Sequence, residues 1–214
     1  MSEWVAIVPL KPPGERKTRL GPHLAADERD RLAALLAGHV MRILAETPRI
    51  RTRIVLAAEQ PSVPHDRWIA DRGRGLNAEL AAARRSVFPA ASLVIHADLP
   101  GLCVADVDTM IDLAEQRGSA VAPDRHLTGT NALALADDRP FEYAFGADSF
   151  AKHRARLGRE CGVASRPGLA LDLDTQADLE FMLDILRRDL REGLIWTGEA
   201  SANYVRAPAL PEAR

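Results

Sequence analysis

Short apolar runs of strand length alternate along this chain with amphipathic segments of helical period. Trp4 to Pro9 predicts a first strand, and the apolar spacing from Asp27 to Glu46 predicts a long helix. Strands that alternate with helices predict an α/β fold, with a mainly parallel sheet covered by helices on both faces. Further strands are expected at 53–58, 68–70, 92–96, 119–122, 131–136 and 169–173, and further helices at 76–88, 106–117, 148–159 and 175–190, the last capped by Thr175.

The alternation fades near the C-terminus, which sets the expected domain boundary. Residues 1–190 carry the pattern, and a chain of 214 residues suits one domain. Residues 191–214 include a stretch rich in alanine and proline, and we expect them to form a tail that is either mobile or docked on the domain.

The charge balance and the cysteine content restrict the partners and the compartment. Lys and Arg number 28 and Asp and Glu 30, so a net charge of −2 creates no field that would attract nucleic acid or an anionic membrane. The two cysteines, Cys103 and Cys161, suggest neither a disulfide framework nor a zinc site. Neither a signal peptide nor a membrane-spanning segment is recognisable. These features predict a soluble cytoplasmic protein.

Two short acidic motifs each end a predicted strand. HADLP spans 96–100 and LDLDT spans 171–175, so Asp98, Asp172 and Asp174 are expected at strand ends. In an open α/β sheet, ligands bind beyond the carboxyl ends of the strands. Magnesium is commonly held there by one or two carboxylates, with phosphate oxygens and water. The motifs therefore predict a magnesium site.

The second motif also has a simpler interpretation. In a strand, residues two apart face the same side, so Asp172 and Asp174 would share one crevice. Alternatively, Asp174 begins the next helix, where an acid favours the helix dipole, and Asp172 is only exposed. Asp98 favours the metal interpretation. His96 is expected to pack beside the site, because magnesium prefers oxygen ligands.

The loop after the first strand is rich in cations. Lys11, Arg16, Lys17 and Arg19 lie within nine residues of one another. Such a loop suits a triphosphate, although a solvated charged loop has the same composition. The order of residues is not that of a Walker loop.

Three polar turns are further candidates. Gly75 to Asn77 lacks the dinucleotide fingerprint, so this turn either lets a base or ribose approach the backbone or simply starts a helix. Small polar turns lie at 129–131 and 145–149. The second leads into a predicted helix with cations after Ser149, and such a helix N-terminus suits a phosphate or carboxylate. The alternative for the last turn is ordinary helix capping by Asp148 or Ser149, which occurs with or without a function.

Taken in order, these motifs resemble those of the 2-phospho-L-lactate and phosphoenolpyruvate guanylyltransferases, which act in biosynthesis of the deazaflavin coenzyme factor 420. Each motif alone is weak, but their order is specific. The motifs are K-x5-KTRL at 11–20, GLN at 75–77, HADLP at 96–100, GTNAL at 129–133, FG-x-x-S at 145–149 with His153, and LDLDT at 171–175.

The resemblance implies a three-layer nucleotidyltransferase fold, like that of nucleotide-sugar pyrophosphorylases, and a reaction of GTP with magnesium. A small phospho-acid would attack the α-phosphorus of GTP and expel pyrophosphate. Asp98, Asp172 and Asp174 would hold the metal, with Asp98 and Lys17 essential for catalysis. Lys11, Lys17, Arg19, Gly75 and Asn77 would bind the nucleotide, and Thr130, Gly146, Ser149 and His153 the phospho-acid.

Several questions stay open at the level of sequence. The resemblance implies 2-phospho-L-lactate, phosphoenolpyruvate or 3-phospho-D-glycerate as the acid, because members of the family divide among these, and the motifs do not distinguish them. A nucleotidyltransferase for a molybdenum cofactor or a sugar phosphate is an alternative, as is a nucleotide-binding module without turnover. An exposed apolar strip on the helix at 27–46 is compatible with a homodimer.

Overall fold

The computed structural model describes residues 3–87 and 90–192, and its strands form a single sheet of seven in the order β3-β2-β1-β4-β6-β5-β7. The strands are β1 (Trp4–Pro9), β2 (Ile50–Ala57), β3 (Arg67–Ala70), β4 (Ala91–Ile95), β5 (Ser119–Pro123), β6 (Thr130–Leu135) and β7 (Gly162–Val163). The helices are α1 (Ala26–Glu46), α2 (Leu76–Arg85), α3 (Val104–Arg117), α4 (Ser149–Leu157), α5 (Pro167–Ala170) and α6 (Gln176–Glu192), with a 3-10 turn, η1, at Thr18–Leu20.

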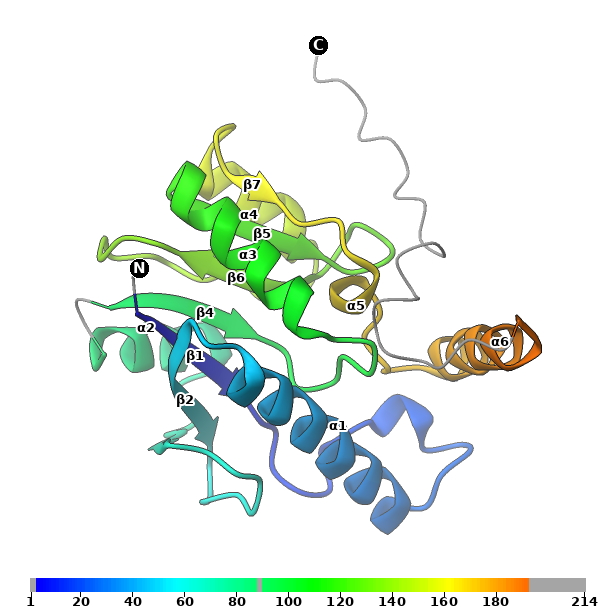
Figure 1. Cartoon of the computed structure of the whole chain (residues 1–214). Coiled ribbons are helices and arrows are strands. Elements are labelled where there is room, and N and C mark those ends of the chain that lie inside the picture. Colours follow the sequence, from blue (N-terminus) through cyan, green and yellow to red (C-terminus); the bar gives the residue numbers. More distant parts are fainter. Residues whose placement is uncertain (1–2, 88–89, 193–214) are drawn as a thin grey trace.

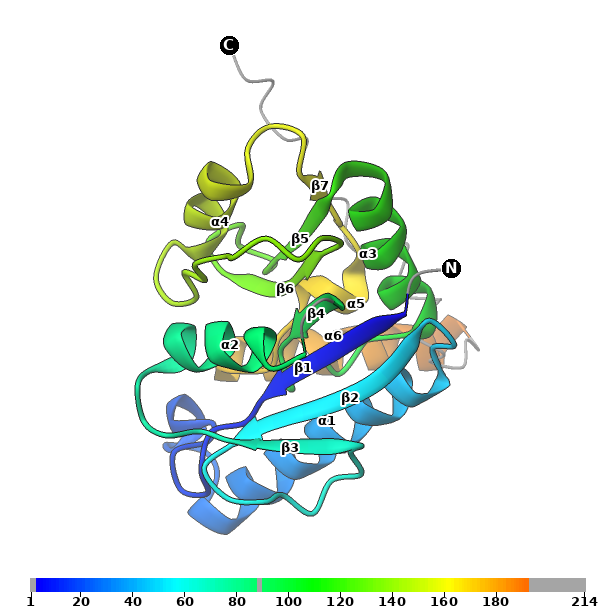
Figure 2. The same cartoon turned by 90° about the vertical axis from the view of Figure 1, so that its left-hand side faces the viewer.

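Helices cover both faces of the sheet (Figure 1, Figure 2). On one face, Val40 of α1 and Met110 of α3 are buried in a core that includes β1 and β4. On the other face, Leu80 of α2 is buried, and Leu157 of α4 packs against the same core. The three layers predicted from the alternation of strands and helices are confirmed.

The sheet is mostly parallel but contains one reversed strand. β1 pairs in parallel with β2 and β4, as β2 does with β3 and β5 with β7, whereas β6 is antiparallel to both of its neighbours. Residues 124–129 connect β5 to β6, which is too short for the crossover that parallel strands need. The Asp124 carboxylate accepts hydrogen bonds from the N–H groups of His126 and Thr128, which fixes this turn.

The strand predicted at 169–173 is wrong. Pro167 opens the short helix α5, as suits a residue whose fixed φ favours the first helical position. Within the described structure, residues 171–175 pair with no strand, but the Leu173 N–H donates to the Asp98 carbonyl at 3.0 Å. Leu171 and Leu173 are buried while Asp172 and Asp174 are half-buried. Residues 171–174 therefore show the alternation of buried and more exposed side chains that is typical of a strand, but they form a loop.

The remaining boundaries agree closely with the sequence. Thr175 caps α6, because its hydroxyl accepts the Asp178 N–H at 3.3 Å. The two-residue strand β7 was not predicted, and the expected tail at 191–214 lies almost wholly outside the described residues. No helix in the described part of the chain could span a membrane. Leu35 on α1 is 72% exposed, and the homodimer stays a prediction.

Candidate active site

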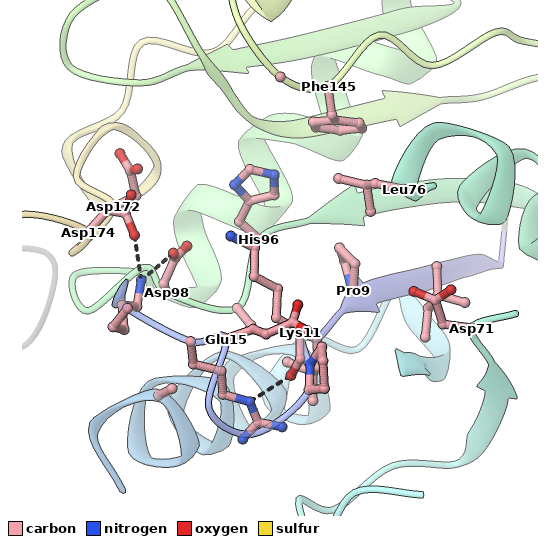
Figure 3. Close-up of a pocket in the computed structure, with 18 residues that line it drawn as sticks. Pro9, Lys11, Glu15, Asp71, Leu76, His96, Asp98, Phe145, Asp172 and Asp174 are labelled. Carbon is pink, nitrogen blue, oxygen red and sulfur yellow. Dashed lines mark hydrogen bonds and ion pairs between the residues drawn. The ribbon is translucent and has the colours of Figure 1, made fainter. Parts of the chain in front are cut away.

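A cavity of about 420 Å³ opens beyond the carboxyl ends of β1 and β4 (Figure 3). Its walls come from the loop after β1, the turn after β4, the segment between β3 and α2, and two loops that precede α4 and α6. Ligands of open α/β sheets bind at this edge, because loops from several strands converge there. Of the predicted site residues, the cavity is lined by Lys11, Lys17, Asp98, Gly146, Asp172 and Asp174.

Lys17 is held between two of the acids. Its Nζ lies 2.5 Å from Asp98 Oδ2 and 3.8 Å from Asp174 Oδ1, and its side chain is only 6% exposed. Lys17 has a φ of 51°, a left-handed conformation that is uncommon outside glycine. Arg19 does not line the cavity, but its Nη1 reaches Asp174 Oδ2 at 3.3 Å from the solvent side. Both cations therefore contact the predicted metal ligands.

Two of the three predicted metal ligands, Asp98 and Asp172, differ in how readily they ionise. Burial opposes ionisation of Asp98, but the nearby Lys17 and His96 outweigh it and hold the pKa of this carboxyl below its ordinary value. Burial raises the pKa of Asp172, and the negative charge of Asp98 raises it further. Asn131 donates to Asp172 Oδ1 at 3.3 Å and helps to orient it. The cavity thus contains one carboxylate, that of Asp172, whose negative charge is poorly compensated by its surroundings.

The donor set fits magnesium. Asp98 Oδ1 is buried and has no hydrogen-bond partner, so this oxygen could accept a cation. However, the described residues contain no cluster of three or more acids, histidines or cysteines placed to hold a metal ion on their own. Magnesium needs only one or two carboxylates when phosphate oxygens and water complete its shell. Metal binding at Asp98, Asp172 and Asp174 therefore stays a prediction that depends on a bound phosphate.

The predicted phospho-acid residues gather behind the cavity wall. Gly146 lines the cavity, whereas Thr130, Ser149 and His153 are at most 2% exposed. His153 Nδ1 lies 2.9 Å from Thr130 Oγ1, and the ring of His153 packs edge-on against Phe145 with centroids 4.8 Å apart. The structure brings the four residues together, but His153 is placed to support the wall rather than to line it.

The predicted nucleotide residues after β3 also support the wall. Asn77 accepts the N–H of Phe145 at 2.8 Å and donates to its carbonyl at 3.1 Å, so it clamps the segment that carries Gly146. Gly75 has a φ of 90°, which only glycine adopts easily, at the start of α2. Neither residue lines the cavity.

Several cavity residues were not predicted from the sequence. Asp71, Leu76 and Phe145 line the cavity. His96, which was expected to pack beside the site, also lines it, with its ring tilted against that of Phe145 and the centroids 5.3 Å apart. The position of Asp71 directly after β3 is the one sequence signal that could have indicated it. That strand is short and half-exposed, so its end looked like an ordinary loop.

The chain is similar to proteins of one family. The family model described as guanylyl transferase CofC like matches residues 4–186. Phosphoenolpyruvate guanylyltransferase of Sphaerobacter thermophilus is 36% identical over 188 residues, which are 82% of this chain and 90% of that protein.

Solved structures share the fold at lower identity. A protein of Desulfovibrio desulfuricans assigned to the nucleotide-diphospho-sugar transferases aligns with a TM-score of 0.67 at 18% identity, over 91% of this chain and all of that one. The 4-diphosphocytidyl-2C-methyl-D-erythritol synthase of Anaerococcus prevotii aligns with a TM-score of 0.58 at 10% identity, over 87% of this chain and 97% of that one. The match to the family model and the 36% identity to the Sphaerobacter protein show that the chain belongs to the guanylyl transferase CofC-like family of nucleotidyltransferases.

Proposed function

We propose that this protein transfers GMP from GTP to the phosphate of a small phosphorylated carboxylic acid and releases pyrophosphate, in biosynthesis of the deazaflavin coenzyme factor 420. The observation that carries the proposal is the cavity in which Lys11, Lys17, Asp98 and Asp172 meet. Cations and carboxylates in one cavity suit a substrate pair that brings several phosphates together with a divalent cation.

The reaction needs no nucleophile from the protein. A phosphate monoester is largely ionised at neutral pH, and its oxygen forms a bond to the α-phosphorus of GTP. The bond from that phosphorus to the bridging oxygen of the β-phosphate breaks, and pyrophosphate leaves with the electron pair. Lys11 and Lys17 would offset the repulsion between the two anions and hold the triphosphate in line for attack.

Asp98 would be the principal ligand of magnesium, with Asp172 and Asp174 beside it. The buried and unpartnered Oδ1 of Asp98 supports this assignment. When bound, the ion would neutralise phosphate charge and polarise the α-phosphoryl group. Lys17 would keep Asp98 ionised and in place.

The acceptor is most directly supported as phosphoenolpyruvate. Relatives that carry this name in Sphaerobacter and Streptomyces are 36% and 35% identical to the chain. The acid would sit beside Gly146, whose surrounding segment is fixed by Asn77 and by the buried Thr130–His153 pair. 2-Phospho-L-lactate and 3-phospho-D-glycerate differ from it by small groups, which a pocket discriminates by only about 1–3 kcal/mol.

The test is to incubate the protein with MgCl₂, GTP and each of the three acids separately. Pyrophosphate release and a product heavier than the acid by one GMP residue, found by mass spectrometry, are expected with phosphoenolpyruvate at the highest rate. ATP and CTP run in parallel test the donor. Turnover only with a sugar phosphate or a molybdopterin would contradict the proposal, and GTP binding without turnover would favour a binding module.

A further inference from the structure

The cavity extends well beyond the cluster of acids, and its other end has a different character. Leu76 lines this end and is 38% exposed despite its apolar side chain. Asp71 also lines the cavity, and Figure 3 shows Asp71 and Leu76 on the opposite side of it from Asp98 and Asp174. An apolar wall with one fixed polar group is typical of a subsite that orients a flat ligand.

The sheet sets the distance between the two ends. Asp71 follows β3 and Asp98 follows β4, and β2 and β1 lie between these strands. Three spacings between neighbouring strands amount to about 14 Å. If the triphosphate lies at Asp98 and Lys17, as the proposed function requires, the base of an extended nucleotide reaches the end marked by Asp71.

Asp71 is held rigidly in this position. Its N–H donates to the Ala57 carbonyl at 2.9 Å, which continues the pairing of β3 with β2. Its Oδ1 accepts the Gly73 N–H at 2.8 Å. The nearby guanidinium of Arg74 is bound instead to the buried Glu79, at 2.7 Å and 2.9 Å. Among residues 3–87 and 90–192 no salt bridge involves Asp71, which leaves acceptor capacity on its carboxylate.

We propose that Asp71 selects guanine as the base of the nucleotide donor. Guanine presents two adjacent donors on its Watson–Crick edge, N1–H and the 2-amino group, and a carboxylate offers two adjacent acceptors. Adenine and cytosine each present an acceptor beside a donor, so they would leave one carboxylate oxygen facing a lone pair. Specificity arises from this repulsion as much as from the two bonds to guanine.

The test compares nucleotide binding by the wild type, Asp71→Asn and Glu59→Gln. Glu59 follows the neighbouring strand β2, is exposed and does not line the cavity, so it serves as the matched control. GTP, ITP, XTP and ATP are titrated with magnesium and without any phospho-acid, by calorimetry. ITP lacks the 2-amino group, and XTP carries an oxygen in its place.

In Asp71→Asn, we expect GTP affinity to fall about 10-fold or more and the preference for GTP over ITP to disappear. XTP affinity should rise by a similar factor, because the asparagine amide donates to the 2-oxo group while its oxygen accepts N1–H. Glu59→Gln should keep the wild-type order. An unfolded protein cannot gain XTP binding, so this gain distinguishes altered recognition from damage.

Unchanged GTP, ITP and XTP affinities in Asp71→Asn would overturn the inference, and so would loss of all binding without a gain of XTP. Because only binding is measured, this failure is distinct from failure of the proposed function. The latter would appear as GTP binding by the wild type without pyrophosphate release in the presence of each acid.

Discussion

His153 is held in one tautomer by its neighbours. Its Nε2 accepts the Ala144 N–H at 2.9 Å, so the proton must lie on Nδ1, which donates to Thr130 Oγ1 at 2.9 Å. The side chain is fully buried. Burial, and then the charges of Arg156 and His96, lower the pKa of His153 from 6.5 to about 4. Protonation would place a second donor against the Ala144 N–H.

The protein should therefore lose stability as the pH falls below 6.5. In the unfolded chain this imidazole binds a proton near pH 6.5, whereas the folded chain resists protonation until about pH 4. The folded state is thus fully favoured above pH 6.5, and the loss is complete below pH 4. Between pH 7.5 and pH 5 we expect the free energy of unfolding to fall by about 2 kcal/mol on account of this residue, measured by urea denaturation.

His153→Gln isolates this effect from other titrating groups. Glutamine offers an oxygen to the Ala144 N–H but does not titrate. The difference in unfolding free energy between wild type and variant should shrink as the pH falls from 7.5 to 5. A difference that is constant across this range would show that His153 is not held neutral.

Asp98 is the residue whose loss should affect turnover most. In Asp98→Asn the side chain keeps its shape but loses its charge, so Lys17 loses the nearer of its two carboxylate partners and the site loses the proposed principal ligand of magnesium. Turnover should fall by about 100-fold or more, as when a group that stabilises the transition state is removed. Asp138→Asn, an exposed change outside the cavity, is the control. Steady-state pyrophosphate release tests this, with circular dichroism to confirm folding, and near wild-type turnover would remove Asp98 from the site.

For single residues, the sequence predicted a place in the site best where the residue follows a strand or belongs to a family motif. Asp98 was expected at a strand end and the family resemblance implied that Lys17 belongs to the same site; in the structure Lys17 Nζ lies 2.5 Å from Asp98 Oδ2. The burial of His153 could not be predicted, because it depends on tertiary contacts with the Phe145 ring and with Thr130 of β6. Asp71 was missed because exposed strand ends and ordinary loops have the same composition.

Among the elements, α5 positions the second acidic motif. Arg166, just before α5, donates from Nε to Asp106 Oδ1 at 2.8 Å, and the other oxygen of Asp106 accepts the Cys103 N–H. Asp106 is almost fully buried. Gly168 packs so closely here that a methyl group would overlap the Asp106 carboxylate and the Gly101 carbonyl. The absence of a side chain at Gly168 therefore allows α5 to dock.

Gly168→Ala should destabilise the protein by about 1–3 kcal/mol, as overpacking of a closely packed site does. The matched control is Gly38→Ala in α1, where an added methyl group meets open space. That change should be neutral or stabilise the helix by up to about 1 kcal/mol, because alanine has the higher helix propensity. Urea denaturation of both variants provides the measurement. Equal stabilities of the two variants would show that α5 is not tightly docked.

The same element explains the error in the predicted strand. A run of five mostly apolar residues fits a buried strand or a short helix equally well, because periodicity cannot separate them at that length. The deciding contacts are tertiary: the Arg125 N–H donates to the Ala170 carbonyl, and the Leu173 N–H to that of Asp98. For other elements the local pattern was enough to predict the structure. The long helix α1 and the apolar strand β1 lie where the sequence predicts them.

In the molecule as a whole, the cavity joins segments that are distant in sequence. Lys11, Asp98 and Asp174 come from three loops that meet at one edge of the sheet. The family motifs indicated that these loops belong to one site, and the parallel pairing of β1 with β4 explains why they meet. The reversed strand β6 does not disturb this edge, because the Asp98 and Lys11 loops follow β4 and β1.

A ligand that bridges these loops should stabilise the whole chain. At a GTP concentration of about 100 times Kd, binding to the folded state adds about 2.7 kcal/mol, which for a domain of this size raises Tm by roughly 5–10 °C. If Asp98 and Asp172 hold magnesium between themselves and the triphosphate, most of this rise should require the ion. Thermal unfolding is therefore measured with GTP and MgCl₂, with GTP and EDTA, and with MgCl₂ alone. A rise with EDTA as large as that with magnesium would show that Lys11, Lys17 and Arg19 bind the triphosphate without help from the acids.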